Sequence, residues 1–369
     1  MDNQHPGISQ HTVNLSRHAL KQMIRVVHDL QNLSENPLYP SKLSKLAGIA
    51  QVHAQNYSVL MAYDFHVTDT QEVKLIEVNT NAGGLWLACG IEYPSKQPLP
   101  EKLARQLLST FIQEYQLFIQ NVQAKPKLIA IVDQLPEQQF LYPEMQGFVQ
   151  LFKQAEIDCI ITDPSEITAN NSALYYKGQH IDLIYNRHCD FYLASPEMQV
   201  IAQAWQQQSV CLTPNPRTYG LLADKQRMVD WSQSELLAEL FSPKIVQRLR
   251  QAIPKTQILG SLDQNTTWSE RKKLVFKPTT GHASRGVYIG DKLTKGKFNS
   301  FDPQTTLVQE RIKPSITITE DNTEFKTDFR LFVYRHTILA ACARIYQGQV
   351  TNLRTPNGGF SQLNLTHSI

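Results

Sequence analysis

The sequence has no long apolar run and few cysteines, and both features restrict what the protein can be. Its first twenty residues are polar, and no later segment among the 369 residues approaches the roughly 18 apolar residues of a membrane span. The five cysteines are odd in number and widely spaced, which predicts reduced thiols rather than a disulfide framework. We therefore expect a cytoplasmic protein with no membrane partner.

The charge of the chain is also low. The formal net charge is +3, and no run of lysine and arginine is interleaved with aromatic residues. A nucleic-acid groove would need such a basic footprint, so we expect no nucleic-acid partner. With 41% hydrophobic and 19% charged residues, the composition is that of an ordinary globular protein with about two or three domains.

Several common catalytic motifs are missing. The sequence has no GxGxxG, CxxC, HExxH or GxSxG pattern, which argues against a dinucleotide fingerprint, a zinc site and a serine hydrolase elbow. The loop at residues 281–286 has glycines at the spacing of a Walker loop. However, Val287 and Tyr288 stand where its Lys-Ser/Thr pair must follow.

The spacing of apolar residues predicts where helices and strands occur along the chain. Apolar residues at helical spacing predict amphipathic helices at residues 15–30, 41–56 and 101–121. Beyond a polar linker, short apolar runs alternate with helical segments from residue 128 to residue 212. This alternation is typical of a parallel sheet with crossover helices, so we predict a Rossmann-like domain at residues 125–222.

One strand-like run carries oxygen ligands. Side chains alternate between the two faces of a strand, so Glu77 and Asn79 should point the same way while Ile76 and Val78 point into a core. Asp64 lies in a preceding strand-like run, and an antiparallel hairpin would bring the three oxygen-bearing side chains together. Such a cluster suits Mg²⁺ carrying nucleotide phosphates. The alternative is a strand with a solvated polar face.

Further polar residues occur downstream at element ends. Lys277 ends a strand-like run before the 281–286 loop, which could cover a polyphosphate or be a surface turn. Lys225 begins a helical segment, and Gln309 precedes a hinge whose backbone could bind adenine. Asp328 and Arg330 share one strand face, although ordinary cross-strand charge pairing would also explain them. The glycines at 358 and 359 predict a turn or a mobile lid.

The order of these motifs resembles the ATP-grasp superfamily. The motifs occur at residues 215–225, 253–256, 275–278, 308–310 and 328–330. Residues 76–80 followed by Gly83 and Gly84, and residues 353–355 followed by two glycines, are most similar to glutathione synthetase of the eukaryotic type. Most members place their metal ligands last, whereas here they come first, which resembles a circular permutation. Ala62 stands where some members have arginine, and the 281–286 loop is poorer in glycine than usual.

This resemblance implies an α/β (α+β) ATP-grasp fold, circularly permuted, with a Rossmann-like pre-ATP-grasp domain. Residues 1–122 would supply N-terminal helices and the metal hairpin, 125–222 the Rossmann-like domain, and 223–369 the nucleotide-binding lobes. The metal hairpin should then lie beside the nucleotide-binding strands. The implied ATP-binding residues are Lys225, Lys277, Gly281, Ser284, Arg285, Gly286, Gln309, Glu310, Arg311 and Ile312; the ligands of Mg²⁺ or Mn²⁺ are Asp64, Glu77 and Asn79; and the residues facing phosphate or a substrate carboxylate are Arg330, Arg344 and Arg354.

The activity that the resemblance implies is ATP-dependent ligation of a carboxylate to an amine. The reaction would proceed through an acyl phosphate, release ADP, and act on an amino acid or small peptide. Two alternatives remain open: a small-molecule kinase on the same scaffold, and an ATP-binding regulatory protein without turnover. The N-terminal helices would either pack on the ATP lobe or form a homodimer.

Overall fold

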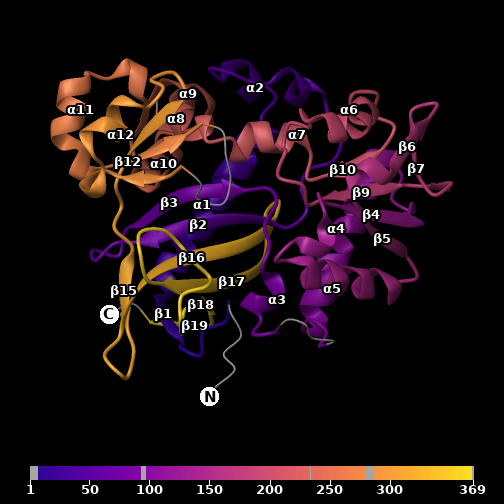
Figure 1. Ribbon diagram of the computed structural model, residues 1–369, viewed down its shortest axis with the longest axis horizontal. Helices are drawn as coiled ribbons and strands as arrows, with labels where there is room; N and C mark the ends of the chain where they lie inside the picture. Colours follow the sequence, from indigo (N-terminus) through magenta and orange to yellow (C-terminus); the bar gives the residue numbers. More distant parts are fainter. Residues whose placement is uncertain (1–6, 93–96, 233, 280–285, 368–369) are drawn as a thin grey trace.

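The computed structural model describes residues 7–92, 97–232, 234–279 and 286–367 (Figure 1). Three larger sheets and two smaller ones make up its β-structure. Figure 1 shows the largest sheet in the middle, a helix-rich lobe at one end and a parallel sheet at the other. Among the helices in the described part of the chain, none is long and apolar enough to cross a membrane.

The largest sheet has six antiparallel strands and carries the predicted metal hairpin. Its strands are β2 (Met61–Val67), β3 (Val73–Asn79), β15 (Ser315–Ile318), β16 (Glu324–Tyr334), β17 (Thr337–Tyr346) and β18 (Gly359–Ser361). The order is β18–β17–β16–β2–β3, with β15 pairing the first part of β16. This register places Asp64 opposite both Glu77 and Arg330, so the predicted hairpin is confirmed.

Helix α1 (Arg17–Glu35) packs against one face of this sheet. Ser16 caps the helix, because its Oγ accepts a hydrogen bond from the amide of Ala19 at 3.1 Å. Met23 and Val27 on its apolar stripe are buried in the same core as Phe65 of β2. The helix therefore lies on the sheet, which is one of the two predicted arrangements. A homodimer remains a prediction.

A smaller antiparallel sheet forms the lobe at one end of the molecule. It consists of β11 (Thr256–Ile258), β14 (Thr306–Glu310), β12 (Leu274–Pro278) and β13 (Tyr288–Ile289), in that order. Five helices gather around it in Figure 1: α8 (Gln226–Ser232), α9 (Ser234–Leu240), α10 (Pro243–Ala252), α11 (Gln264–Glu270) and α12 (Lys295–Asn299). Its own core centres on Phe276, Phe298 and Val308.

The predicted parallel sheet is also present. Its strand order is β10 (Cys211–Thr213), β9 (Leu183–Asn186), β4 (Leu128–Val132) and β5 (Asp158–Thr162). Helices α4 (Glu101–Ile119) and α5 (Tyr142–Lys153) share a core with Ile129 and Ile131, whereas α6 (Gln199–Gln206) shares another with Ala130 and Val132. Because alternate residues of β4 face two helical layers, the whole strand is apolar. The domain boundaries themselves remain predictions.

The expected helix at residues 41–56 is wrong. Only α2 (Tyr39–Lys42) and a single 3₁₀ turn (Gly48–Gln51) form there. Side chains from elsewhere bind the carbonyls that a helix would use, since Arg227 donates to Lys45 O at 2.5 Å and Trp205 donates to Ile49 O at 3.2 Å. These long-range partners stabilise the irregular path.

The remaining elements are short. The N-terminal strand β1 pairs in parallel with the C-terminal strand β19, so the two chain ends lie together. Helix α3 follows β3 after a short turn, and α7 precedes a π-helical turn that leads to Lys225. These elements are β1 (Val13–Ser16), α3 (Leu85–Ala88), β6 (Ile167–Asn170), β7 (Ala173–Tyr176), β8 (Gln179–His180), α7 (Pro216–Thr218) and β19 (Leu363–Thr366).

Candidate active site

A cavity of about 520 Å³ opens between the largest sheet and the small antiparallel sheet. Strands β2, β3, β16 and β17 supply one wall, and β12, β13 and β14 supply the other. The β2–β3 hairpin therefore lies beside the small antiparallel sheet, as predicted, while the metal and nucleotide roles of the two remain predictions. Of the candidate site residues, those lining the cavity are Asp64, Glu77, Asn79, Lys225, Lys277, Gln309, Glu310, Arg311, Ile312 and Arg344.

The other candidates lie elsewhere. Arg330 is buried directly against Asp64 and does not line the cavity, and Arg354 is an exposed residue beyond β17. Gly286 has a φ of +76° and precedes Val287, which does line the cavity. The predictions for Gly281, Ser284 and Arg285 lie outside the described residues.

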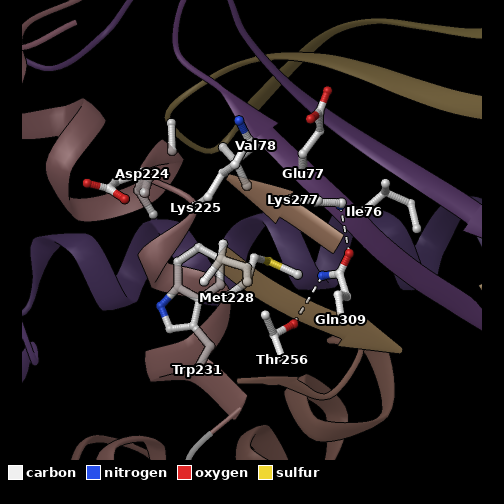
Figure 2. Close-up of a pocket in the computed structure, with 13 residues that line it drawn as sticks. Ile76, Glu77, Val78, Asp224, Lys225, Met228, Trp231, Thr256, Lys277 and Gln309 are labelled. Carbon is white, nitrogen blue, oxygen red and sulfur yellow. Dashed lines mark hydrogen bonds between the residues drawn. The ribbon is translucent and has the colours of Figure 1, made fainter. Parts of the chain in front are cut away.

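A β-bulge at Ile76 aims Glu77 and Asn79 into the cavity. The β2–β3 register shifts, so that Asp64 pairs with Glu77 but the next residue, Phe65, pairs with Leu75. The extra residue, Ile76, reverses the alternation of β3, because one inserted residue moves all later side chains to the other face. The prediction that Ile76 points into the core is therefore wrong. Both residues line the pocket in Figure 2, but Ile76 is only partly buried, whereas Val78 is buried in the core as expected.

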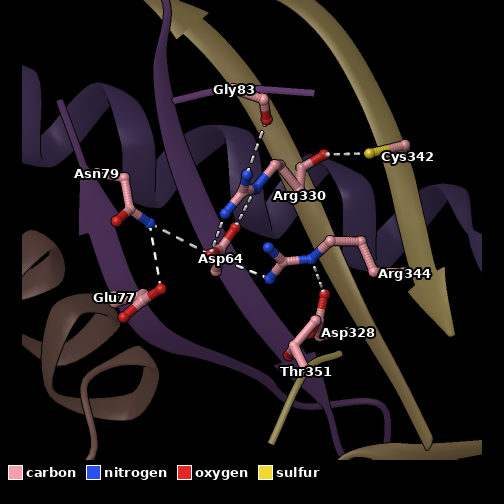
Figure 3. Close-up of polar contacts among 9 residues, drawn as sticks. All are labelled: Asp64, Glu77, Asn79, Gly83, Asp328, Arg330, Cys342, Arg344 and Thr351. Carbon is pink, nitrogen blue, oxygen red and sulfur yellow. Dashed lines mark hydrogen bonds and ion pairs between the residues drawn. The ribbon is translucent and has the colours of Figure 1, made fainter. Parts of the chain in front are cut away.

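Asp64 is at the centre of a buried charge network (Figure 3). Arg330 Nε and Nη2 donate to the two Asp64 carboxylate oxygens, each at 2.7 Å. Arg344 Nη2 lies 3.0 Å from Asp64 Oδ2, and Arg344 Nε donates to Asp328 Oδ1 at 2.6 Å. Burial alone would raise the pKa of Asp64, but Arg330 and Arg344 hold it well below its usual range. The Asp64 carboxylate therefore remains charged.

Two lysines, Lys225 and Lys277, line the cavity together with Glu77 (Figure 2). Lys277 Nζ donates to Gln309 Oε1 at 2.7 Å, and Gln309 Nε2 donates to Thr256 Oγ1 at 3.1 Å. Burial lowers the pKa of both Lys277 and Lys225, while the carboxylate of Glu77 opposes that shift at both lysines. Two partly desolvated ammonium groups near one carboxylate form a region suited to a polyanion.

The predicted adenine hinge is partly engaged within the sheet. The amide of Glu310 donates to Lys255 O and the amide of Arg311 donates to Lys273 O, both at 2.8 Å. The Arg311 guanidinium also pairs with Asp291 at 2.7 Å. Contact between these two amides and adenine therefore stays a prediction that the present hydrogen bonds disfavour.

The three predicted metal ligands differ in how well they suit Mg²⁺. Glu77 and Asn79 lie side by side, with Asn79 Nδ2 3.3 Å from Glu77 Oε1, and both reach the cavity. One carboxylate and one amide oxygen fit Mg²⁺, which usually takes few protein ligands and completes its shell with phosphates and water. Asp64 fits less well, because both of its oxygens already accept from guanidinium groups. In the described part of the chain, no group of three or more His, Cys, Asp and Glu side chains could hold a metal.

The predicted glycine lid after β17 is not free to move as a separate loop. Gly359 begins β18 and pairs with Ile345 of β17. Phe360 donates its amide to Gly7 O and accepts from the Ser9 amide, both at 2.8 Å. The N-terminal segment thus fixes these residues in place, and the lid prediction is wrong for Gly359.

Sequence reasoning missed His66. It follows Asp64 by two residues on β2, so strand alternation alone would place it on the same face. Its Nδ1 lies 2.9 Å from Ile312 O, and since a carbonyl only accepts, Nδ1 carries the proton. Burial lowers the pKa of His66, so the ring is neutral. Stacked Phe191 and Tyr219, with ring centroids 4.4 Å apart, also line the cavity and carried no local signal.

Comparison with known proteins bears on the fold. No protein-family model and no curated protein matches the sequence. A glutathione synthetase-like effector from Globodera pallida aligns over 98% of this chain and 91% of its own, with 11% identity and a TM-score of 0.61. A proposed gamma-glutamylcysteine synthetase from Methylobacillus flagellatus aligns over 95% and 87%, with 11% identity and a TM-score of 0.53. The chain therefore has the ATP-grasp fold that its motif order predicts, in the form found in glutathione synthetase-like proteins.

Proposed function

We propose that the protein is an ATP-dependent ligase that joins a carboxylate to an amine and releases ADP. The observation that supports this most directly is the single cavity lined by Lys225, Lys277, Glu77, Asn79 and Arg344. It combines cations for a polyphosphate, oxygen ligands for a hard cation and a further guanidinium beyond them. The fold of glutathione synthetase-like proteins adds to this support.

In the first step, a carboxylate oxygen of the substrate attacks the γ-phosphorus of ATP, and ADP leaves. Lys277 and Lys225 neutralise phosphate charge, and the hydrogen bond from Lys277 to Gln309 fixes the position of the ammonium group. Glu77 and Asn79 would hold Mg²⁺, which supplies charge stabilisation to the phosphate oxygens. The chain itself provides no covalent nucleophile in this scheme.

In the second step, the amine attacks the acyl phosphate carbonyl, the amine proton passes to solvent and inorganic phosphate leaves. Arg344, one of the arginines that line the cavity, would stabilise the oxyanion. Two of its nitrogens bind Asp64 and Asp328, which orients the guanidinium and leaves other N–H groups to donate. Arg330 has all three nitrogens engaged, by Asp64 and Gly83 O, so we assign it to positioning.

The chain order supports a circular permutation. Strands β2 and β3 come early in the sequence, yet β2 pairs with β16, whose Arg330 lies opposite Asp64. A permuted ATP-grasp chain would place its metal-ligand hairpin there. A variant that joins the present termini and opens the chain in the 121–126 linker tests the idea, since it should fold and retain nucleotide binding.

Isotope transfer tests the reaction directly. With an ¹⁸O-labelled carboxylate substrate, an acyl phosphate pathway moves one ¹⁸O into inorganic phosphate, and ADP release requires both carboxylate and amine. A panel of amino acids and short peptides with mass analysis of products would identify the pair. A stable phosphate ester would instead indicate the kinase alternative, and nucleotide binding without turnover would indicate a regulatory protein.

A further inference from the structure

The turn at residues 80–84, which connects Asn79 of β3 to helix α3, is held by buried charged side chains. Arg187 Nη1 donates to Ala82 O at 2.7 Å, and Arg330 Nη1 donates to Gly83 O at 3.3 Å. The Gly84 amide donates to the Glu144 carboxylate, with the nearer oxygen at 3.0 Å. Two arginines from different sheets therefore hold two consecutive carbonyls of one turn.

Arg187 comes from the parallel sheet and is 6% exposed. It follows β9 at the carboxyl end of the central strands, where its own amide donates to Val132 O at 2.8 Å. Open α/β sheets usually bind their ligands at this edge, near the point where strand order reverses. Here the chain's own turn fills the space next to Arg187, because Asn81 Nδ2 also donates to Arg187 O at 2.7 Å.

Packing leaves no room for a side chain at the centre of this turn. A Cβ at Gly83 would lie 2.7 Å from Arg187 Nη2 and 2.2 Å from Leu141 Cδ1. The glycine therefore allows the backbone to lie directly on the guanidinium. Arg187 is not among the residues that line the cavity.

We propose that Arg187 is a positioning residue for the metal-binding pair: by holding Ala82 O, it fixes how far Glu77 and Asn79 project into the cavity. This inference rests on the proposed function. Only two residues separate Asn79 from Ala82, so any movement of the turn moves Asn79. Since Arg330 binds Gly83 O and Asp64 together, the turn connects the parallel sheet to the charge network.

The test compares Arg187→Ala and Arg187→Lys with Arg217→Ala. Arg217 is a matched control, since its Nη1 also approaches backbone carbonyls, Ala50 O and Gln51 O, both at 3.5 Å, away from the turn. Hydrogen exchange in the full-length protein should be about tenfold faster at residues 80–90 in Arg187→Ala. Arg187→Lys should be intermediate, Arg217→Ala should match wild type, and added guanidinium ion should slow exchange in Arg187→Ala again.

Calorimetry of ADP binding supplies a second measurement. In the presence of Mg²⁺, Arg187→Ala should bind ADP about tenfold more weakly than wild type, because residues that support metal ligands contribute to metal affinity. Without Mg²⁺, the two proteins should bind ADP equally. Equal weakening with and without Mg²⁺ would mean a general structural effect and overturn the proposal, as would unchanged exchange in both Arg187 variants. If wild type binds no nucleotide, the proposed function fails, while the exchange data still test the turn. If Arg187→Ala does not fold, both measurements are made on Arg187→Lys instead.

Discussion

Arg330 binds both carboxylate oxygens of Asp64, through two nitrogens that each lie 2.7 Å from an oxygen. The two residues are 266 positions apart in the chain and stand opposite each other on β16 and β2. Asp64 is 2% exposed, and this bidentate pairing occupies both of its oxygens. The carboxylate therefore has little room to bind a metal ion. We therefore regard Asp64 as the residue that holds Arg330 and Arg344 in place.

Replacing Asp64 with asparagine should mainly destabilise the fold. The change leaves two buried guanidinium groups with one carboxylate, Asp328, so the free energy of unfolding should fall by about 3 kcal/mol or more. Urea denaturation measures this. Asp29→Asn is the control, because Asp29 binds Arg248 with the same two-bond geometry at a site where Arg248 is 27% exposed. Its loss should cost about 1 kcal/mol. Equal losses would contradict the assignment.

Glu77→Gln should have the opposite profile. The side chain reaches the cavity and contacts Asn79 and Asp64, but among the described contacts it forms no ion pair with Arg330 or Arg344, so stability should change little. ADP release at fixed Mg²⁺ should fall on the order of 100-fold, with partial recovery at high Mg²⁺, because one anionic metal ligand is lost. Glu72→Gln on the exposed turn of the same hairpin provides the matched control. Full turnover by Glu77→Gln would refute the metal assignment.

Much of this site could be predicted because its pieces are local. Leu128–Val132 is an apolar run and Asp64 lies in an alternating one, so each predicts its own strand. The bulge at Ile76 could not be predicted, since it is a property of the pairing between β2 and β3. The same holds for Gly84, whose φ is +89° and whose added Cβ would lie 2.5 Å from the Phe360 ring. Glycine is required at position 84 because of its contact with Phe360, a residue near the other end of the chain.

Substitution of Arg344 should reduce activity much more than substitution of Arg354, although the sequence made both of them candidates. Arg344 lines the cavity, whereas Arg354 is exposed on the loop beyond β17. Arg344→Lys should lower kcat at least about tenfold, because lysine cannot reproduce the two contacts to Asp64 and Asp328. Arg354→Lys should stay within about twofold of wild type in the same steady-state assay. A larger loss at Arg354 would mean that its loop folds over the cavity during turnover.

Asp133 should give stability a specific pH dependence. Burial raises the pKa of Asp133 to about 6, although Arg187 opposes the shift. A carboxyl whose folded pKa is raised stabilises the fold fully below its unfolded pKa near 4, and that contribution is lost as pH rises through 6. Asparagine does not titrate. The stability of Asp133→Asn relative to wild type should therefore increase by about 2 kcal/mol between pH 4 and pH 7.5. Denaturation at both pH values measures it, and a constant difference would exclude the shift.

Lys277→Met should lose activity without losing stability. Lys277 is a desolvated cation whose described hydrogen-bond partner is the neutral side chain of Gln309, and burial lowers its pKa. Replacing such a group with an apolar side chain of similar length removes a desolvation cost, so the free energy of unfolding should stay equal or rise. The KM for ATP should increase at least about tenfold, because a phosphate partner is gone. Lys273→Met, on the exposed turn before β12, is the control.

Asp64→Asn should lose stability where Lys277→Met does not, and this contrast separates residues that maintain the fold from residues retained for the nucleotide. Loss of stability in Lys277→Met with unchanged KM would assign Lys277 to the fold instead.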